Sequence, residues 1–401
     1  MLAVLHGRTY RHLFGAQVIA LTGSGLATVA LGLLAYELAG PRAGAVLGTA
    51  LAIKMVAYVT VAPIAAALLG GLSRRAVLVA LDLVRAGVAV ALPWAGEVWQ
   101  IYVLIFLLQA ASAAFTPLFQ ATIPDVLTDE RDYTRALTLS RMAYDLEGLL
   151  SPALAAAALT VLGFHDLFLG TAAGFAASAL LVVSVLLPRN TPAPRPATTR
   201  GIRIYLATPR LRGLLAAHLA AAAAGSMVLV NTVGYVRDVL HRDAPDVAIA
   251  LGANGIGSLA AAVVLPRLLD RVPDRVVVVR AVAALVVLLF TGTMVAGTWP
   301  MLLVLWTLIG AACTFALTPG ARLLRRSASP DDRAAVFAAD FALSHTCWLV
   351  CYPLAGWLAS AASMTTAFAV LGVIAAGALM IARRVWVSDT AKSVAVPAGR
   401  R

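Results

Sequence analysis

Charged residues are scarce in this sequence. Lys, Arg, Asp and Glu make up 12% of its 401 residues, whereas a soluble domain carries about 25% charged residues. Hydrophobic residues make up 61% of the chain. This balance excludes an ordinary soluble domain and favours a chain that lies largely in the hydrocarbon of a membrane.

Cysteine is rare in this sequence, and the common catalytic motifs are absent from it. The three cysteines, Cys313, Cys347 and Cys351, fall inside apolar stretches, so no disulfide framework is expected. Cys347 and Cys351 share a helix face, but no second close Cys or His pair completes a metal site with them. The sequence has no nucleotide-binding loop, Ser-His-Asp arrangement or zinc-protease motif. We therefore expect neither an ATP-driven pump nor an enzyme, and no cofactor.

Long apolar stretches bounded by charge, Pro or Gly are abundant. A helix needs about 20 apolar residues to cross a bilayer, and twelve stretches have that length. They predict transmembrane helices over residues 13–37, 44–69, 76–95, 99–120, 137–162, 165–187, 211–236, 246–269, 276–296, 299–320, 335–359 and 363–386. The sequence therefore predicts an all-α membrane protein.

Basic residues collect in every second connection between these stretches. If the N-terminus is cytoplasmic, the outer loops hold only Arg42, Arg237 and Arg242. Because basic loops resist translocation, both termini and the long middle segment are expected in the cytoplasm, as in a bacterial-type inner membrane. The net charge of +12 then faces anionic lipid headgroups and does not indicate nucleic-acid binding.

A polar segment divides the twelve spans six and six. Residues 188–212 are rich in Pro, Thr and Arg, and they separate an N-terminal bundle, residues 1–187, from a C-terminal bundle and tail, residues 213–401. Residues 201–206 alternate basic and apolar side chains. This pattern fits a segment lying on the inner leaflet and equally fits a simple tether.

The two halves resemble each other in sequence. The first half contains Pro117, then an acidic loop, then Pro152. The second half repeats this pattern as Pro319, an acidic loop and Pro353, and the separations between the two prolines differ by one residue. Parallel repeats of six spans are typical of transporters that bind substrate between two halves. Since one chain supplies both halves, we expect a monomer.

The chain resembles the major facilitator superfamily along nearly its whole length. The loop between spans two and three in that family has a Gly, an Asp-Arg step and a basic pair. Here Arg74 and Arg75 form the basic pair, and Gly70 stands in place of the Asp. The second half keeps the step as Asp270 and Arg271. The resemblance implies two six-helix bundles.

The same resemblance implies a cytoplasmic gate at these loops. Asp82 lies one helical turn before Arg85, so we expect it to take over part of the role of the missing carboxylate. A local ion pair of no gating importance is the alternative interpretation.

A narrower resemblance is to the branch that contains siderophore exporters and nickel-resistance exporters. It rests on residues 27–37, 53–58 and 138–147. The nickel exporters have a His-rich C-terminal tail, whereas residues 385–401 contain no His. This departure weakens a metal substrate without excluding it.

Ionisable residues within the spans are the main candidates for function. A charge at mid-bilayer costs several kcal/mol unless it faces a cavity or a partner. Lys54 lies about 15 Å into span two, and Glu147 lies at a similar depth in span five, close to Asp145. A Lys opposite carboxylates makes a proton-coupling device. A static ion pair that fixes helix packing is the alternative.

Neutral polar residues extend this candidate set. Gln109 is the polar residue of span four, where many proton antiporters of the family carry an Arg. Asn231 and Asn254 are candidates for hydrogen bonds to substrate or, equally, for hydrogen bonds that join helices.

Span eleven carries a further pair of candidates. Asp340 and His345 are able to shuttle protons near a cavity, since His titrates near neutral pH. A structural role is the alternative for His345, and also for His218 in span seven.

The sequence thus predicts a secondary active transporter that exports a small amphipathic organic solute, driven by protons. A mostly apolar cavity with one Lys and few carboxylates suits such a solute. The acids and histidines also suit a divalent metal such as nickel or cobalt. A non-transporting receptor or scaffold is the third interpretation.

Overall fold

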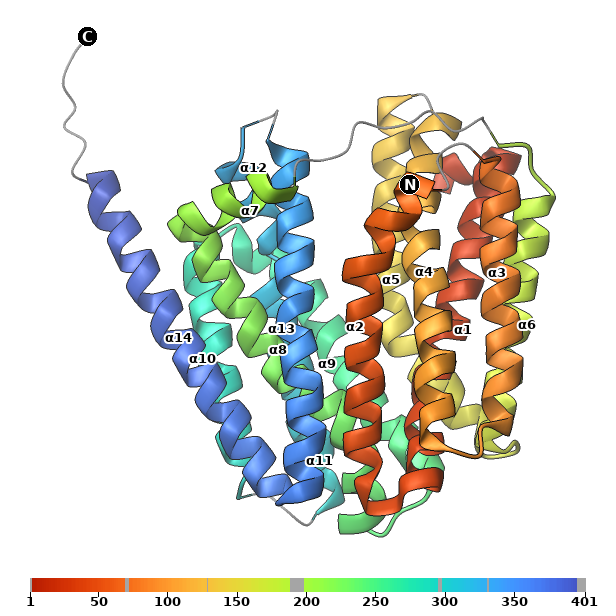
Figure 1. Cartoon of the computed structure of the whole chain (residues 1–401). Coiled ribbons are helices and arrows are strands. Elements are labelled where there is room, and N and C mark those ends of the chain that lie inside the picture. Colours follow the sequence, from red (N-terminus) through yellow and green to blue (C-terminus); the bar gives the residue numbers. More distant parts are fainter. Residues whose placement is uncertain are drawn as a thin grey trace. The chain divides into compact units, whose positions relative to one another are not determined.

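The computed structural model describes residues 2–68, 72–127, 129–187, 198–294, 298–329 and 332–394, and these residues contain helices and no strand (Figure 1). The long helices of this part are α1 (Arg8–Ala39), α2 (Ala43–Leu68), α3 (Arg74–Ala91), α4 (Val98–Val126), α5 (Glu130–Ala158), α6 (Phe164–Val183), α8 (Pro209–Gly234), α9 (Ala244–Leu269), α10 (Asp274–Gly292), α11 (Trp299–Leu317), α13 (Arg333–Ala361) and α14 (Met364–Val394). The short ones are η1 (Leu2–His6), η2 (Gly40–Arg42), η3 (Leu92–Trp94), α7 (Thr198–Ala207), η4 (Tyr235–Val239) and α12 (Gly320–Ser327).

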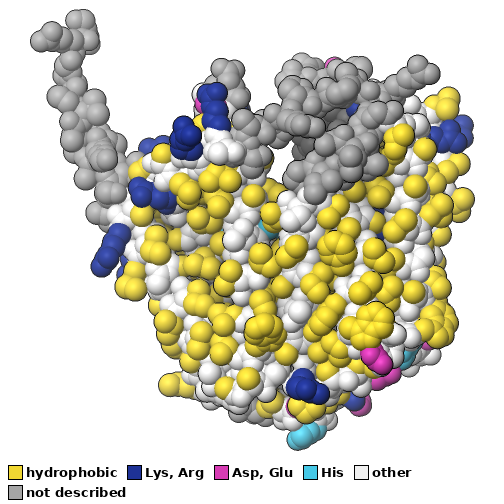
Figure 2. Space-filling view, in the orientation of Figure 1, with side chains coloured by type: hydrophobic (Ala, Val, Ile, Leu, Met, Phe, Trp, Pro, Cys, Tyr) yellow, Lys and Arg dark blue, Asp and Glu magenta, His cyan; other side chains and the backbone are white. Residues whose placement is uncertain are grey.

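Each predicted span corresponds to one long helix, which confirms the all-α membrane fold. Ten helical stretches of the described residues are long and apolar enough to cross a membrane. One of them, Arg8–Val61, runs through both α1 and α2. The acid-bearing helix α5 is not among the ten. Hydrophobic side chains cover the middle of the face shown in Figure 2, and charged side chains gather toward its ends.

The helix ends follow local backbone chemistry. Gly40 ends α1 with a φ of 51°, a left-handed conformation that favours glycine. Ser73 caps α3, because its hydroxyl oxygen accepts a hydrogen bond from the Ala76 N–H at 3.3 Å. At the start of α4 the Gln100 side chain accepts from the Glu97 N–H at 3.2 Å, as in a capping box.

The chain divides into two compact units. Unit 1 comprises Met1–Ala193 and Val233–Gly252, and unit 2 comprises Pro194–Thr232 and Ala253–Arg401. In unit 1, α1 packs against α5 and α6, α3 packs against α4 and α6, and α2 packs against α4. In unit 2, α10 packs against α11 and α14. The predicted boundary at residues 188–212 stays a prediction, and most of its first part, residues 188–197, lies outside the described residues.

The second part of the predicted linker forms the amphipathic helix α7, which packs against α13 of unit 2. Arg200 pairs with Asp332 at 2.8 Å, and the Tyr205 hydroxyl donates to the Asp340 Oδ1 at 2.8 Å. The backbone of Gly201 lies so close to the Ala335 carbonyl that a Cβ atom would not fit. One face of α7 is therefore fixed to the bundle.

Candidate functional site

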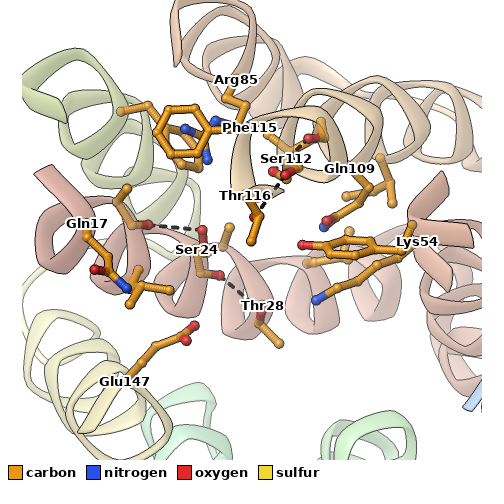
Figure 3. Close-up of a pocket in the computed structure, with 18 of the residues that line it drawn as sticks. Gln17, Ser24, Thr28, Lys54, Arg85, Gln109, Ser112, Phe115, Thr116 and Glu147 are labelled. Carbon is orange, nitrogen blue, oxygen red and sulfur yellow. Dashed lines mark hydrogen bonds between the residues drawn. The ribbon is translucent and has the colours of Figure 1, made fainter. Parts of the chain in front are cut away.

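A cavity of about 260 Å³ lies within unit 1 and takes its walls from α1 to α6. Aliphatic and aromatic side chains form much of this wall, and the Phe115 and Phe175 rings are among them. The polar side chains that line it are Gln17, Ser24, Thr28, Lys54, Tyr58, Arg85, Gln109, Ser112, Thr116 and Glu147 (Figure 3). The wall is therefore apolar with a charged and hydrogen-bonding lining, which suits an amphipathic ligand.

Lys54 of α2 and Glu147 of α5 both line this cavity (Figure 3), and their role in coupling stays a prediction. They come from different helices and carry opposite charges when ionised. Yet none of the described carboxylates lies within 4.0 Å of the Lys54 ammonium. The ammonium lies 6.0 Å from the centre of the Tyr58 ring. Two opposite charges therefore share one cavity without forming a closed ion pair.

A glycine on α1 lets α5 pack closely against it near Glu147. A Cβ atom at Gly25 would collide with the Ser151 side chain and would lie 3.6 Å from the Glu147 Cγ. The absence of a side chain at position 25 thus allows α5 to approach α1 at the depth of Glu147. Gln109 of α4 lines the same cavity.

Arg85, a predicted gate residue, also lines the cavity. Its guanidinium carbon lies 4.0 Å from the centre of the Phe115 ring and 4.5 Å from that of Phe175. Its hydrogen-bond partner is the buried Asp82, which also accepts from the Ser178 hydroxyl at 2.8 Å. The buried cation is thus stabilised by one carboxylate and two aromatic faces.

An ion pair lies at each of the two predicted gate loops. The residue at the helix start is basic in unit 1 and acidic in unit 2. In unit 1, the buried Arg74 at the start of α3 pairs with Asp125 near the end of α4. In unit 2, Asp274 at the start of α10 accepts from Arg326 of α12 at 3.0 Å. The sequence analysis did not single out Asp125 or Asp274. An acidic residue close to each basic loop in the sequence could have predicted these ion pairs.

The other loop candidates have less defined positions. Asp270 and Arg271 lie exposed in the turn between α9 and α10, and Arg75 lies half-buried beside Arg74. Gly70 lies outside the described residues, as does the side chain of Asp145. Whether the loops act as a gate stays a prediction.

The two asparagines join helices of unit 2. The fully buried Asn231 donates to the Ala355 carbonyl at 3.1 Å. Asn254 donates to the Trp306 carbonyl, also at 3.1 Å. These bonds favour the helix-joining interpretation over direct contact with substrate.

Asp340 lies beside a histidine of another helix. The Nε2 of His218 of α8 lies 3.4 Å from the Asp340 Oδ1. The Nδ1 of His345 lies 2.6 Å from the Phe341 carbonyl oxygen of its own helix. His345 and Asp340 are five positions apart on α13 and so point in different directions. Whether either histidine shuttles protons stays a prediction.

Metal-ligating side chains do not cluster in the part of the chain that the structure describes. No group of three or more His, Cys, Asp or Glu side chains there is arranged to hold a metal ion.

Comparison with known proteins identifies the family of this chain. The model of the Major Facilitator Superfamily matches residues 13–290 and, in a second match, residues 214–401. The chain belongs to the major facilitator superfamily. No curated protein matches the sequence.

Solved structures of other major facilitator transporters share the fold. A mutant of the nucleoside transporter NupG is 14% identical with a TM-score of 0.75, over 94% of this chain and 99% of that one. An inward-facing bacterial homologue of the human lysosomal transporter Spinster is 13% identical with a TM-score of 0.75, over 95% and 97%. A POT family transporter in complex with a thioalcohol-conjugated peptide is 12% identical with a TM-score of 0.75, over 96% of each chain. At such identities the likeness establishes the fold alone.

Proposed function

We propose that this major facilitator protein exports a small amphipathic organic solute from the cytoplasm in exchange for protons. It acts in the inner membrane of a bacterial-type cell, as a monomer with both termini in the cytoplasm. The family supports transport, and the arginine-rich connections support the orientation. The solute and the direction of transport are our own inference.

The cavity of unit 1 is the observation that carries this proposal. Leu31, Leu51 and Phe115 supply apolar walls, while Lys54 and Glu147 supply opposite charges. An apolar solute with one polar or charged group satisfies both parts of this lining. A fully polar solute would leave the apolar walls without a partner.

Glu147 gives the cavity a means of responding to protons. Uptake of a proton by this carboxylate removes one negative charge from a cavity of about 260 Å³. The attraction between Lys54 and Glu147 then ends, so Lys54 is released to bind water or a group of the solute. Occupation by solute and protonation of Glu147 are thereby linked, as coupled transport requires.

Transport by reconstituted protein tests the proposal. Proteoliposomes that hold the full chain and a pH-sensitive dye are given members of a panel of amphipathic organic solutes. We expect an active solute to release protons from acid-loaded vesicles. Glu147→Gln is expected to abolish this release, whereas Glu37→Gln, a matched loss of an exposed carboxylate on α1, is expected to preserve it.

Growth of a sensitive host that expresses the chain tests the substrate class. Protection against organic solutes would support the proposal. Protection against nickel or cobalt salts alone would overturn the organic substrate. No protection together with no solute-dependent proton movement would favour a receptor or scaffold.

A further inference from the structure

A second cavity, of about 530 Å³, lies within unit 2 and is lined in part by α12. Figure 1 shows α12 at the same end of this unit as α7. It is formed by the start of α8, the turn between α9 and α10, the start of α10, α12 and α14. Its charged lining comprises five arginines against two aspartates, a surplus of three positive charges: Arg210, Arg271, Arg275, Arg322 and Arg326 against Asp270 and Asp274. The cavity includes Asp270 and Arg271 of the predicted gate loop, and it shares no lining residue with the cavity of unit 1.

The arginines of this cavity are held in place by the fold. The Asp274 side chain is 6% exposed, accepts from Arg326 at 3.0 Å and lies 3.7 Å from the Arg322 Nε. The Arg322 and Arg326 side chains are nevertheless 44% and 60% exposed. One buried carboxylate therefore orients two guanidinium groups that still face open space.

A tryptophan fixes another part of the cavity wall. Trp386 of α14 is 2% exposed, and its indole N–H donates to the Arg210 carbonyl at 3.2 Å. The small residue Gly213 allows this ring to lie against α8, since a Cβ atom there would collide with it. Leu269 and Leu323 add apolar surface to the lining. The cavity thus combines a cationic lining with an apolar part.

We propose that this cavity binds a phosphate-bearing anion, and that the headgroup of an anionic phospholipid of the inner leaflet supplies it. Guanidinium groups bind phosphate oxygens through paired, charge-assisted hydrogen bonds. The distribution of arginines places this end of unit 2 at the cytoplasmic surface, where anionic lipids concentrate. The apolar part of the lining suits the start of the acyl chains.

Lipid binding to the purified full-length protein tests this proposal. Native mass spectrometry in detergent, titrated with phosphatidylglycerol or phosphatidylcholine, gives the dissociation constant for each lipid. We expect the wild type to bind phosphatidylglycerol at least tenfold more tightly. Arg271→Gln/Arg275→Gln is expected to weaken that binding about 25-fold, at about fivefold for each basic residue removed.

The matched control removes two arginines elsewhere on the same side of the membrane. Arg383→Gln/Arg384→Gln removes two exposed guanidinium groups from α14 that do not line the cavity. We expect this variant to change phosphatidylglycerol binding less than twofold. An equal loss in both double variants would mean diffuse attraction to the membrane surface and would overturn the proposal.

Competition with soluble anions separates the two sources of phosphate. Glycerol 3-phosphate or inorganic phosphate that displaces phosphatidylglycerol at millimolar concentration would support a soluble occupant of the same site. Resistance to both would support the lipid headgroup. No saturable binding of the lipid, of glycerol phosphate or of inorganic phosphate would overturn the proposal.

Conservative variants keep the test valid if the glutamine variant does not fold. Arg271→Lys/Arg275→Lys keeps both charges but loses the planar guanidinium fork. We expect it to bind phosphatidylglycerol about fivefold more weakly than the wild type and to keep its selectivity over phosphatidylcholine. Binding of the two lipids with equal affinity by this variant and by the wild type would overturn the proposal.

Discussion

The two units are built from equivalent helices but differ in what fills their interiors. Asn254 of α9 lies 200 positions after Lys54 of α2, and Trp348 of α13 lies 201 positions after Glu147 of α5. Gly25 makes room for the α5 side chains in unit 1, and Gly225 makes room for the Trp348 ring in unit 2. Both units thus have a glycine at the equivalent close approach of two helices. A charged side chain lies near it in unit 1, and an aromatic ring packs against it in unit 2.

Hydrogen bonds between helices complete the interior of unit 2. The buried Trp306 donates its indole N–H to the Thr232 hydroxyl at 2.7 Å, and its carbonyl accepts from Asn254. Its ring lies 6.2 Å from that of Phe368. Unit 2 therefore uses these positions for packing, whereas unit 1 uses them for a charged cavity. The proposed coupling through Lys54 and Glu147 therefore rests on unit 1.

Replacing Lys54 and Glu147 with neutral residues tests the difference between the two units. These substitutions are expected to have the largest effect on transport. Lys54→Gln and Glu147→Gln are each expected to reduce proton-coupled transport more than tenfold, because each leaves one charge in the cavity without its counterpart. Lys54→Gln/Glu147→Gln is expected to recover thermal stability but not transport. Solute-driven proton flux and the melting temperature measure the two effects.

The matched change in unit 2 is Asn254→Ala. We expect it to lower thermal stability through the lost bond to Trp306 and to leave coupling, measured as protons moved per solute, unchanged. A loss of coupling in Asn254→Ala as large as that in Glu147→Gln would contradict the division between the units.

The two close-packed glycines are expected to show the next largest effects. Gly25→Ala forces the Ser151 side chain to shift, and Gly225→Ala forces the Trp348 ring to shift, each at a cost of about 1–3 kcal/mol. Because Gly25 adjoins Glu147, its substitution is expected to reduce transport more than the fall in stability explains. Gly225→Ala is expected to reduce transport only in proportion to the fall in stability.

Two further glycines provide controls for these substitutions. A Cβ atom at Gly87 of α3 or at Gly377 of α14 meets no atom within 4 Å. Gly87→Ala and Gly377→Ala are therefore expected to leave transport and the melting temperature unchanged. If Gly25→Ala behaved like Gly87→Ala, the close approach of α1 and α5 would not matter for the cavity.

Reversal of the inner ion pairs tests a smaller difference between the units. Arg74 lies 200 positions before Asp274, so the repeat keeps a charged residue at the helix start and reverses its sign. We expect Arg74→Asp to lower the free energy of unfolding by about 1 kcal/mol, since the paired Asp125 is partly exposed. Arg74→Asp/Asp125→Arg is expected to restore most of this loss in thermal melts. If the double variant were no more stable than Arg74→Asp, the pair would require the positive charge on α3 and the negative charge on α4.

Sequence alone predicted the helices, because length and apolar composition are readable from the order of residues. It also placed Lys54 and Glu147 at a similar depth; both line one cavity, and their role in coupling stays a prediction. The sequence did not show which way each helix is rotated. It therefore gave no sign that Arg85, a predicted gate residue, lines the cavity, or that His218 lies 3.4 Å from Asp340. A membrane helix is apolar toward lipid and toward its neighbours, so its sequence carries little information on which face points inward.

Docking of α7 also escaped prediction, and Tyr205 tests it with the smallest expected effect. Burial and the neighbouring Asp340 raise the pKa of Tyr205 above its usual value near 10. Near neutral pH, Tyr205→Phe is expected to cost about 1 kcal/mol, through the lost bond to Asp340. Above about pH 10 the unfolded phenol loses its proton while the folded one retains it, so the stability of the wild type falls with rising pH.

The penalty of Tyr205→Phe should therefore shrink as pH rises through 10, because the variant has no phenol to titrate. Melting temperatures of the wild type and the variant between pH 8 and pH 11 measure this change. Tyr102→Phe, on the half-buried side of α4 in unit 1, provides the control. A penalty for Tyr205→Phe that stays constant with pH would mean that the α7 contact does not keep the phenol protonated, and α7 would then be held mainly by Arg200 and Gly201.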